Sequence, residues 1–155
     1  MFKILIVEDE EKIRVELQNL LNRYGYEALT LDDFHEVDQQ ILRIQPHLVL
    51  LDINLPEMDG YMICRSLRQQ SSIPILMVTS RSSDLDELMS MSLGADDFIT
   101  KPYNVQILLA HIQAVLKRAY PQDQGRLLEV NGVTLDLSKG CVMHENQSVE
   151  LTKNE

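Results

Sequence analysis

The 155-residue sequence is poor in cysteine, in positive charge and in long apolar segments. Its two cysteines, Cys64 and Cys141, have no metal-binding spacing, and a reduced, intracellular compartment is the simplest interpretation. The 14 lysines and arginines are outnumbered by 24 acidic residues, which gives a net charge of −10. Such a charge is unsuited to a surface that grips nucleic acid. Either this chain does not touch DNA, or its basic part is missing.

The sequence also lacks an export or membrane signal. The N-terminal apolar run, 4–7, ends at once at Glu8 and Asp9, and it is far too short for a signal peptide or a membrane span. We therefore expect a cytoplasmic protein with no membrane partner. There is no internal repeat or low-complexity tract. With 45% hydrophobic and 25% charged residues, the composition is that of an ordinary globular domain with a sizeable core, plus a remnant.

Short apolar runs alternate with helical patterns from the N-terminus to about residue 120. The runs that predict strands are 3–7, 27–31, 48–51, 75–78 and 98–100. The segments with apolar residues at helical spacing are 13–24, 37–44, a third that follows Gly60 and reaches 67, 84–94 and 105–116. Gly25 and Pro46 suit helix ends, and Asp84 can cap the fourth helix. These five units predict an α/β fold: a doubly wound, flavodoxin-like parallel sheet in the order 2-1-3-4-5.

The pattern changes after the fifth helix. Residues 1–120 form the predicted α/β domain, and 121–126 resemble a linker. Residues 127–155 are β-like, with turn signals, and predict a C-terminal antiparallel β segment that is too short to be an independent domain. A capping box begins at Leu151 and Thr152, just before the last residue, Glu155, so we expect a helix to start there.

Polar residues stand where four of the predicted strands end. Glu8 and Asp9 follow the first strand, Asp52 the third, Thr79 the fourth and Lys101 the fifth. Because the carboxyl ends of parallel strands line one crevice, we expect these side chains to converge. Three carboxylates packed together need a counter-charge, and Mg²⁺ is the natural hard cation for oxygen ligands.

This constellation predicts phosphoryl chemistry. Asp52 ends the central strand and is the best candidate for a carboxylate nucleophile. Mg²⁺ and Lys101 would neutralise charge on the transferred oxygens, and the Thr79 hydroxyl could donate a hydrogen bond to one of them. The backbone carbonyl of Asn54 is a plausible further metal ligand. Each residue alone has an ordinary explanation, such as helix N-terminal charge for 8–11 or a turn for Asp52. Their joint placement at strand ends favours the functional interpretation.

The residues also carry a resemblance to a known family. The matching stretches are 4–10, 51–60, 78–81 and 94–103. They resemble two-component response regulators of the OmpR/PhoB type, which have a winged-helix output domain. The resemblance implies that Asp52 is the phosphoacceptor, that Glu8 and Asp9 are the metal acids, and that Lys101 binds phosphate and precedes a cis proline. It makes Thr79 the switch hydroxyl and Phe98 the switch aromatic residue. The family usually has tyrosine at that last position.

The resemblance further implies a regulatory phosphoacceptor rather than an enzyme, with a capacity for self-dephosphorylation. Its partners would be a sensor histidine kinase, a second copy on phosphorylation and, for the full-length protein only, promoter DNA. Residues 127–155 resemble the N-terminal sheet of the winged-helix domain, so the recognition helix would lie beyond 155. The stretch 108–114 also resembles regulators of resistance to cell-envelope peptide antibiotics.

The family's dimer face, formed by the fourth helix, fifth strand and fifth helix, has an altered charge pattern here. The residues that we place on it are Glu87, Asp96, Asp97, Ile107, His111 and Arg118. His111 stands where a second arginine is usual, and an imidazole is largely neutral near pH 7. Spacing predicts that Ile107, His111 and Arg118 share one helix face. The core face, with Val105 and Ile112, should lie opposite.

Other interpretations remain open from the residues alone. A haloacid-dehalogenase-type phosphohydrolase would need a second acid two residues after Asp52, where Asn54 stands. A flavodoxin-like FMN binder would need a phosphate-cradling first loop, which the acids 8–11 would repel. A stand-alone receiver is the third alternative. Adaptable packing, rather than a cofactor site, is the default for Met89 and Met91, and Cys64 is most simply a buried, inert thiol. The scattered histidines, His35, His47, His111 and His144, have no ligand spacing.

Overall fold

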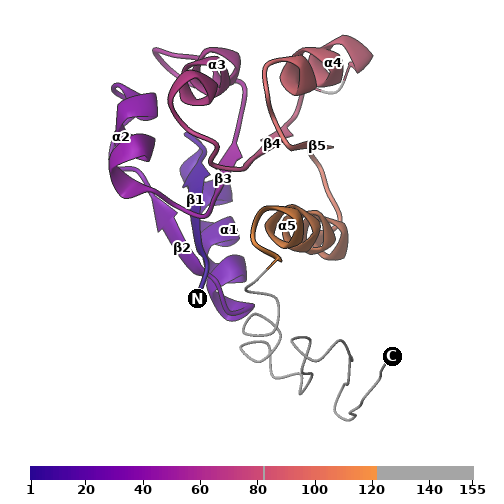
Figure 1. Ribbon diagram of the computed structural model, residues 1–155. Helices are drawn as coiled ribbons and strands as arrows, with labels where there is room; N and C mark the ends of the chain where they lie inside the picture. The colour runs from indigo at the N-terminus through magenta and orange to yellow at the C-terminus, as the bar shows by residue number, and fades with distance from the viewer. Residues whose placement is uncertain (82, 122–155) are drawn as a thin grey trace.

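A computed structural model describes residues 1–81 and 83–121 of the chain (Figure 1). Five parallel strands form one sheet in the order β2-β1-β3-β4-β5. They are β1 (Lys3–Val7), β2 (Glu27–Thr30), β3 (Leu48–Leu51), β4 (Ile75–Thr79) and β5 (Asp97–Thr100). The predicted sheet and its order are confirmed. The predicted linker beyond 121 and the predicted β segment 127–155 lie outside the described residues.

Five helices connect and flank the strands in the described part of the chain. They are α1 (Glu11–Arg23), α2 (Val37–Ile44), α3 (Gly60–Gln70), α4 (Asp84–Ser92) and α5 (Val105–Ala119). In Figure 1, α2 and α3 lie on one side of the sheet and α5 on the other. Among the residues described, no helix is long and apolar enough to cross a membrane.

The sheet is buried on both faces, as its continuous apolar runs predict. Ile4 and Ile6 of β1 belong to the same core as Leu17 of α1 and Ile112 of α5. The alternate residues, such as Leu5, belong to a second core with residues of α2 and α3. Because neighbouring side chains on a strand point to opposite faces, each strand contributes to both cores. Fully burying one such side chain stabilises the fold by about 1.5–3 kcal/mol.

Two predictions about helix placement are wrong. Ser83, not Asp84, caps α4: its side-chain oxygen accepts a hydrogen bond from the Asp86 amide, so Asp84 is already the first helical residue. Val105 is 39% exposed and does not lie on the core face of α5. It stands in the first turn, where α5 borders a groove of about 670 Å³ that Leu20 and Tyr103 also line. For α4, the capping residue sets where the helix begins, which the spacing of apolar residues alone does not define.

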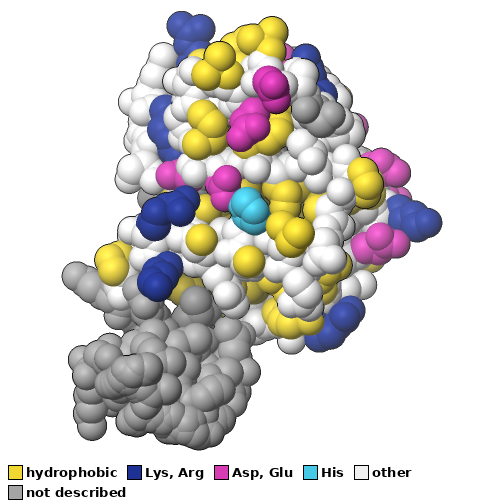
Figure 2. Space-filling view, turned by 90° about the vertical axis from the view of Figure 1, so that its right-hand side faces the viewer, with side chains coloured by type: hydrophobic (Ala, Val, Ile, Leu, Met, Phe, Trp, Pro, Cys, Tyr) yellow, Lys and Arg dark blue, Asp and Glu magenta, His cyan; other side chains and the backbone are white. Residues whose placement is uncertain are grey.

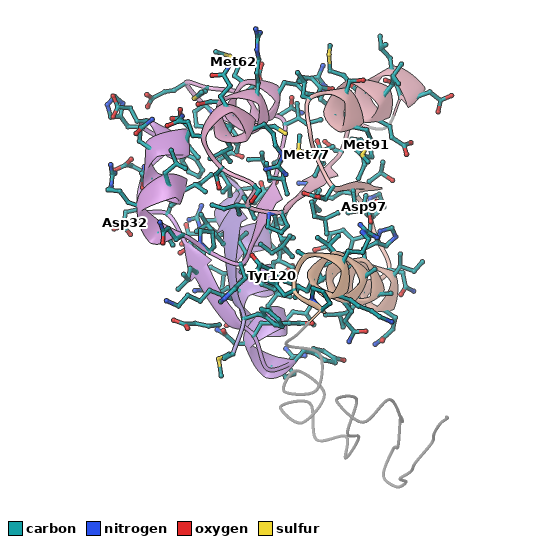
Figure 3. All side chains as sticks on the ribbon, in the orientation of Figure 1. Asp32, Met62, Met77, Met91, Asp97 and Tyr120 are labelled. Carbon is teal, nitrogen blue, oxygen red and sulfur yellow. The ribbon has the colours of Figure 1, made fainter. Side chains whose placement is uncertain are left out.

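The α4 helix exposes most of its apolar residues. Met89 and Met91 are each 44% exposed, so neither is buried in the interior. Leu85 and Leu88 are exposed as well, and the one buried residue of the helix is Ser90. Figure 2 views the molecule from the side of α4 and α5, and hydrophobic side chains gather over the upper part of this face. Figure 3 shows Met91 on α4, beside β5 and Asp97.

Candidate functional site

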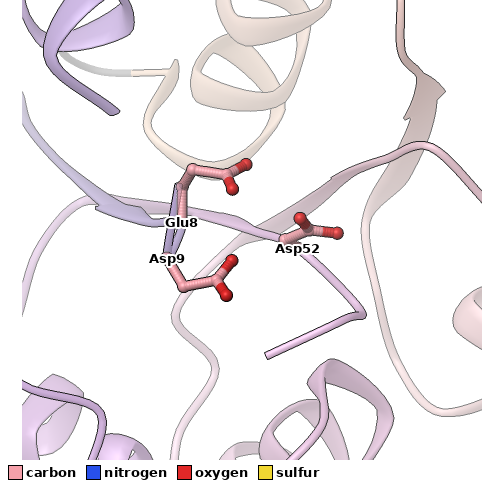
Figure 4. Close-up of side chains that lie close together, drawn as sticks. All are labelled: Glu8, Asp9 and Asp52. Atoms are coloured by element: carbon pink, nitrogen blue, oxygen red, sulfur yellow. The ribbon is translucent and has the colours of Figure 1, made fainter. Parts of the chain in front are cut away.

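The predicted acidic residues meet at the carboxyl ends of β1 and β3 (Figure 4). Glu8 follows the last residue of β1, and Asp52 follows the last residue of β3. Each of Glu8, Asp9 and Asp52 offers a carboxylate oxygen, and these oxygens lie within 4.8 Å of one another. Glu8 and Asp52 are buried, whereas Asp9 is exposed. The parallel pairing of β1 with β3, Val7 against Leu51, places these side chains side by side.

Lys101 contacts two of the three carboxylates. Its Nζ lies 2.8 Å from Glu8 Oε1 and 3.2 Å from Asp52 Oδ2. Burial by itself lowers the pKa of Lys101, but the hydrogen bond that Lys101 donates to Glu8 and the charges of both acids outweigh this effect and raise the pKa. The lysine therefore stays charged at neutral pH. It reaches the site because Lys101 follows β5 directly, and its backbone N–H donates to the carbonyl of Thr79 at 2.8 Å.

The charge on Glu8 is incompletely compensated. Burial raises the pKa of Glu8, and this effect exceeds the opposing hydrogen bonds from Lys101 and from the amide of Glu10. Arg14 of α1 donates to the backbone carbonyl of Glu8 at 3.0 Å, which fixes the loop that carries the acids. A carboxylate held in a buried site favours a nearby cation. The site thus has an excess of negative charge over the single lysine.

The three carboxylates form a chemically suitable metal site. All their donor atoms are hard oxygens, which suit Mg²⁺ rather than softer metals. Asp9 is exposed, and neither of its oxygens is bonded to Lys101. The residues that could hold a metal are therefore Glu8, Asp9 and Asp52, as expected from the sequence.

Gly60 allows the loop after β3 to fold tightly. The Gly60 N–H donates to the carbonyl of Ile53 at 2.8 Å, and a Cβ at Gly60 would clash with the backbone carbonyl of Asp52. Asp59 caps the N-terminus of α3 by accepting from the amide of Met62. The loop after β3 is therefore bound directly to the start of α3, and this packing positions Asp52.

Thr79 and Phe98 lie inside the molecule near this end of the sheet. Thr79 is fully buried at the end of β4, and its Oγ1 accepts from the backbone N–H of Arg81 at 3.3 Å. Phe98 is 8% exposed and belongs to the core that includes Met77 and Cys64.

Burial raises the pKa of the Cys64 thiol, as expected for an inert interior cysteine.

The predicted dimer-face residues lie on α4, in or directly before β5, and on α5, but two of the acids already have partners. Asp97 is paired with His111, and Asp96 is paired with Arg68 of α3 at 2.8 Å. Glu87 and Arg118 are exposed, and Ile107 is 52% exposed. The acids before and in β5 thus make intramolecular contacts that the spacing did not predict.

A polar cluster beside the site was not predicted from the sequence. Arg81 lies 3.4 Å from Asp86 of α4, stacks over the ring of Tyr61 of α3, and donates to the side chain of Asn54 at 3.5 Å. Tyr61 donates in turn to Asp86 at 2.6 Å. Arg81 stands within one of the family-like stretches, which is the one signal that could have drawn attention to it. Its partners come from three separate elements, so no local pattern reveals them.

This fold and this arrangement of acids, threonine and lysine define a receiver domain. Residues 4–113 match the family model described as the response regulator receiver domain, and the chain belongs to this family. The Lys101–Pro102 peptide bond is cis, as the resemblance implied. The two rival interpretations from other families, a phosphohydrolase and an FMN binder, are thereby set aside.

Relatives of known role support the same family. The chain is 43% identical over 159 residues to the transcriptional regulatory protein YxdJ of Bacillus subtilis, covering 100% of this chain and 69% of that protein. It is 40% identical over 157 residues to the sensory transduction protein BceR of Halalkalibacterium halodurans, covering 100% of this chain and 68% of that protein. These relatives are response regulators of the OmpR/PhoB type, so the resemblance stated above is confirmed.

A solved structure shows the same fold. The BeF₃-activated N-terminal receiver domain of Klebsiella pneumoniae RstA superposes with a TM-score of 0.71 at 35% identity, covering 74% of this chain and 98% of that one. The chain is thus a receiver domain of a two-component response regulator, a family whose general role is to accept a phosphoryl group from a kinase.

Proposed function

We propose that Asp52 is the residue that accepts the phosphoryl group, from a phosphohistidine of a sensor histidine kinase. The observation that carries the proposal is the contact of the Lys101 ammonium with both Asp52 and Glu8, at 3.2 and 2.8 Å, at the end of a buried sheet. A buried carboxylate next to a fixed ammonium is a nucleophile with a partner for the incoming oxygens. In the transfer, an Asp52 oxygen bonds to phosphorus, the P–N bond breaks, and the imidazole leaves with the bonding electrons and takes up a proton.

The neighbouring residues would hold the metal and the phosphoryl oxygens. Glu8, Asp9 and Asp52, with the backbone carbonyl of Asn54, would bind Mg²⁺, whose charge offsets that of the transferred group when it is bound. Lys101 would bind one phosphoryl oxygen. The Thr79 hydroxyl, whose oxygen accepts from the Arg81 backbone N–H, would donate its own hydrogen to another. Phe98 would respond by packing alone, because its ring has no hydroxyl.

Labelling with a small phosphodonor tests the assignment. Acetyl phosphate and Mg²⁺ should add one base-labile phosphoryl group to the wild type, measured by mass spectrometry. Asp52→Asn should abolish it, and EDTA should prevent it. Asp32→Asn removes an exposed aspartate and should label normally, which controls for the loss of one charge. Labelling that persists in Asp52→Asn would disprove the choice of phosphoacceptor. The decay of the label also measures self-dephosphorylation.

We propose further that the phosphorylated protein forms a homodimer through α4, β5 and α5. Leu85, Leu88 and Ile107 are 69%, 63% and 52% exposed on this face and provide apolar area for an interface. Because Asp96 and Asp97 are paired within the monomer, fewer acids are available for pairs across the interface. Exposed ion pairs contribute only about 0.2–1 kcal/mol each, so apolar burial can replace them. The full-length protein would then act on promoter DNA.

Analytical ultracentrifugation tests the dimer. Beryllofluoride should promote dimers of the wild type, with little change between low and high salt. Ile107→Glu should weaken this dimer strongly, because it places a charge in an apolar contact, whereas Arg118→Ala should weaken it slightly. An intact dimer in the Ile107→Glu protein would place the interface elsewhere.

A further inference from the structure

The α4 helix is held to the molecule by polar contacts at both ends. Its apolar residues face solvent, so burial contributes little to its attachment. At the C-terminal end, Arg68 of α3 donates to the carbonyl of Gly94 at 2.7 Å, and the Cys64 thiol contacts the carbonyl of Leu93. At the N-terminal end, Asp86 is the attachment point. The two ends are thus bound to α3 by different residues.

The N-terminal attachment is a network centred on Asp86. Its carboxylate accepts from Tyr61 at 2.6 Å and from the capping residue Ser83 at 2.7 Å, and it lies 3.4 Å from Arg81. The hydrogen bond from Ser83, followed by that from Tyr61, lowers the pKa of Asp86, so the carboxylate is ionised. Burial and the Asp86 contact raise the pKa of Tyr61 to about 12, so the phenol remains a donor.

Arg81 connects this network to the phosphorylation site. Its guanidinium donates to the Asn54 side-chain oxygen at 3.5 Å, and the backbone N–H of Asn54 donates to Asp52 at 3.4 Å. Its backbone N–H donates to Thr79. The same guanidinium lies 5.4 Å from the centre of the Tyr61 ring. One side chain therefore contacts both the loop after β3 and the start of α4.

We propose that Arg81, by bridging Asp86 and Asn54, is the positioning residue through which the phosphorylation site controls the placement of α4. This inference rests on the proposed function of Asp52. A phosphoryl group adds about 1.5–2 negative charges and three acceptor oxygens, and a guanidinium binds such a group better than it binds a single carboxylate. Phosphorylation therefore draws Arg81 away from Asp86 and weakens the N-terminal attachment of α4, while Arg68 keeps the C-terminal end in place.

Hydrogen exchange of the α4 amides, measured by mass spectrometry, tests this bridge. In the unphosphorylated protein, Arg81→Ala and Tyr61→Phe should each raise exchange about three- to tenfold, as expected for the loss of one contact that opposes local opening. Asn54→Ala should raise it too, and the double variant with Arg81→Ala should add nothing further. The control is Arg65→Ala, an exposed arginine of α3 without a hydrogen bond or ion pair to any residue that the structure describes.

The same exchange measurement on the phosphorylated protein is the second part of the experiment. The label should raise α4 exchange in the wild type and in Arg65→Ala, but should cause no further rise in Arg81→Ala. If phosphorylation raised α4 exchange equally in Arg81→Ala and in the wild type, the bridge would be overturned. An arginine with a merely structural role would leave the effect of phosphorylation on exchange unchanged. The mass of the labelled peptide is recorded in the same experiment. If the wild type takes up no label, the phosphoacceptor proposal is refuted. The bridge is then tested by α4 exchange in the unphosphorylated Asn54 and Arg81 variants alone.

Discussion

The two helices that flank β5, α4 and α5, are attached to the domain in opposite ways. The buried residues of α5 are all apolar: Leu108, Leu109, Ile112, Val115 and Leu116. The single buried residue of α4 is Ser90, while Leu85 and Leu88 are exposed. The core therefore holds α5, and hydrogen bonds and ion pairs hold α4. A helix attached by polar contacts can be displaced without opening the core, and its exposed apolar side is available to a partner.

The largest expected difference between these helices is in stability. Ile112→Ala should lower the free energy of unfolding by about 2–5 kcal/mol, because it leaves a cavity in the core beneath α5. Leu88→Ala on α4 should change it by no more than about 0.5 kcal/mol, because the side chain is 63% exposed. Urea denaturation of the monomer measures both. Comparable losses in the two variants would mean that α4 is packed as firmly as α5.

Mg²⁺ should stabilise the carboxyl end of the sheet, where the three acids lie, and leave α4 unaffected. A metal that binds only the folded state adds about 2.7 kcal/mol at 100 times its dissociation constant, so the melting temperature should rise. Asp9→Asn should reduce the shift, and Asp32→Asn should not. Exchange of the α4 amides should stay unchanged, since Glu8, Asp9 and Asp52 all lie outside α4. A metal that slowed α4 exchange, or left the melting temperature constant, would contradict this separation.

Tyr61→Phe isolates one contact of α4. The variant removes the hydrogen bond to Asp86 while keeping the ring, and it should lower the free energy of unfolding by about 0.5–1.5 kcal/mol. Tyr24→Phe, in which the tyrosine is 40% exposed, is the matched control and should be nearly neutral. If both variants were equally stable, the polar attachment of α4 would lose its main support.

The smallest effect concerns His35, whose exposed contact with Glu57 lies on neither helix. The hydrogen bond to Glu57, followed by the charge of Glu36, raises the pKa of His35. Since the folded-state pKa lies above the unfolded one, the contact stabilises the fold at acidic pH, and this contribution is lost as the pH rises through the folded-state pKa. NMR titration should therefore give a lower pKa for His35 in Glu57→Gln. An unchanged pKa would show that even this contact has no effect in solution.

Much of the fold and of the candidate site could be predicted from the residues alone. Continuous apolar runs indicate strands buried on both faces, and polar residues directly after them indicate where each strand ends. Glu8, Asp52 and Lys101 follow β1, β3 and β5 for that reason, and parallel pairing brings them together. Their roles as phosphoacceptor, metal ligand and phosphate-binding residue remain predictions.

Only the tertiary structure decided how α4 and the start of α5 are placed. Helical spacing predicts Val105 on the core face of α5, yet it is exposed, and so are Leu88 and Met89 of α4. Spacing defines which residues share a helix face, but the face that turns inward depends on the capping residue and on contacts with other elements. For α4 those contacts come from Tyr61 and Arg81, which are distant in sequence or outside the helix. The sequence by itself determined the sheet and the cluster of strand-end residues, because both follow from local runs of one kind of side chain. The polar attachment of α4 depends on long-range contacts, and these exist only once the chain is folded.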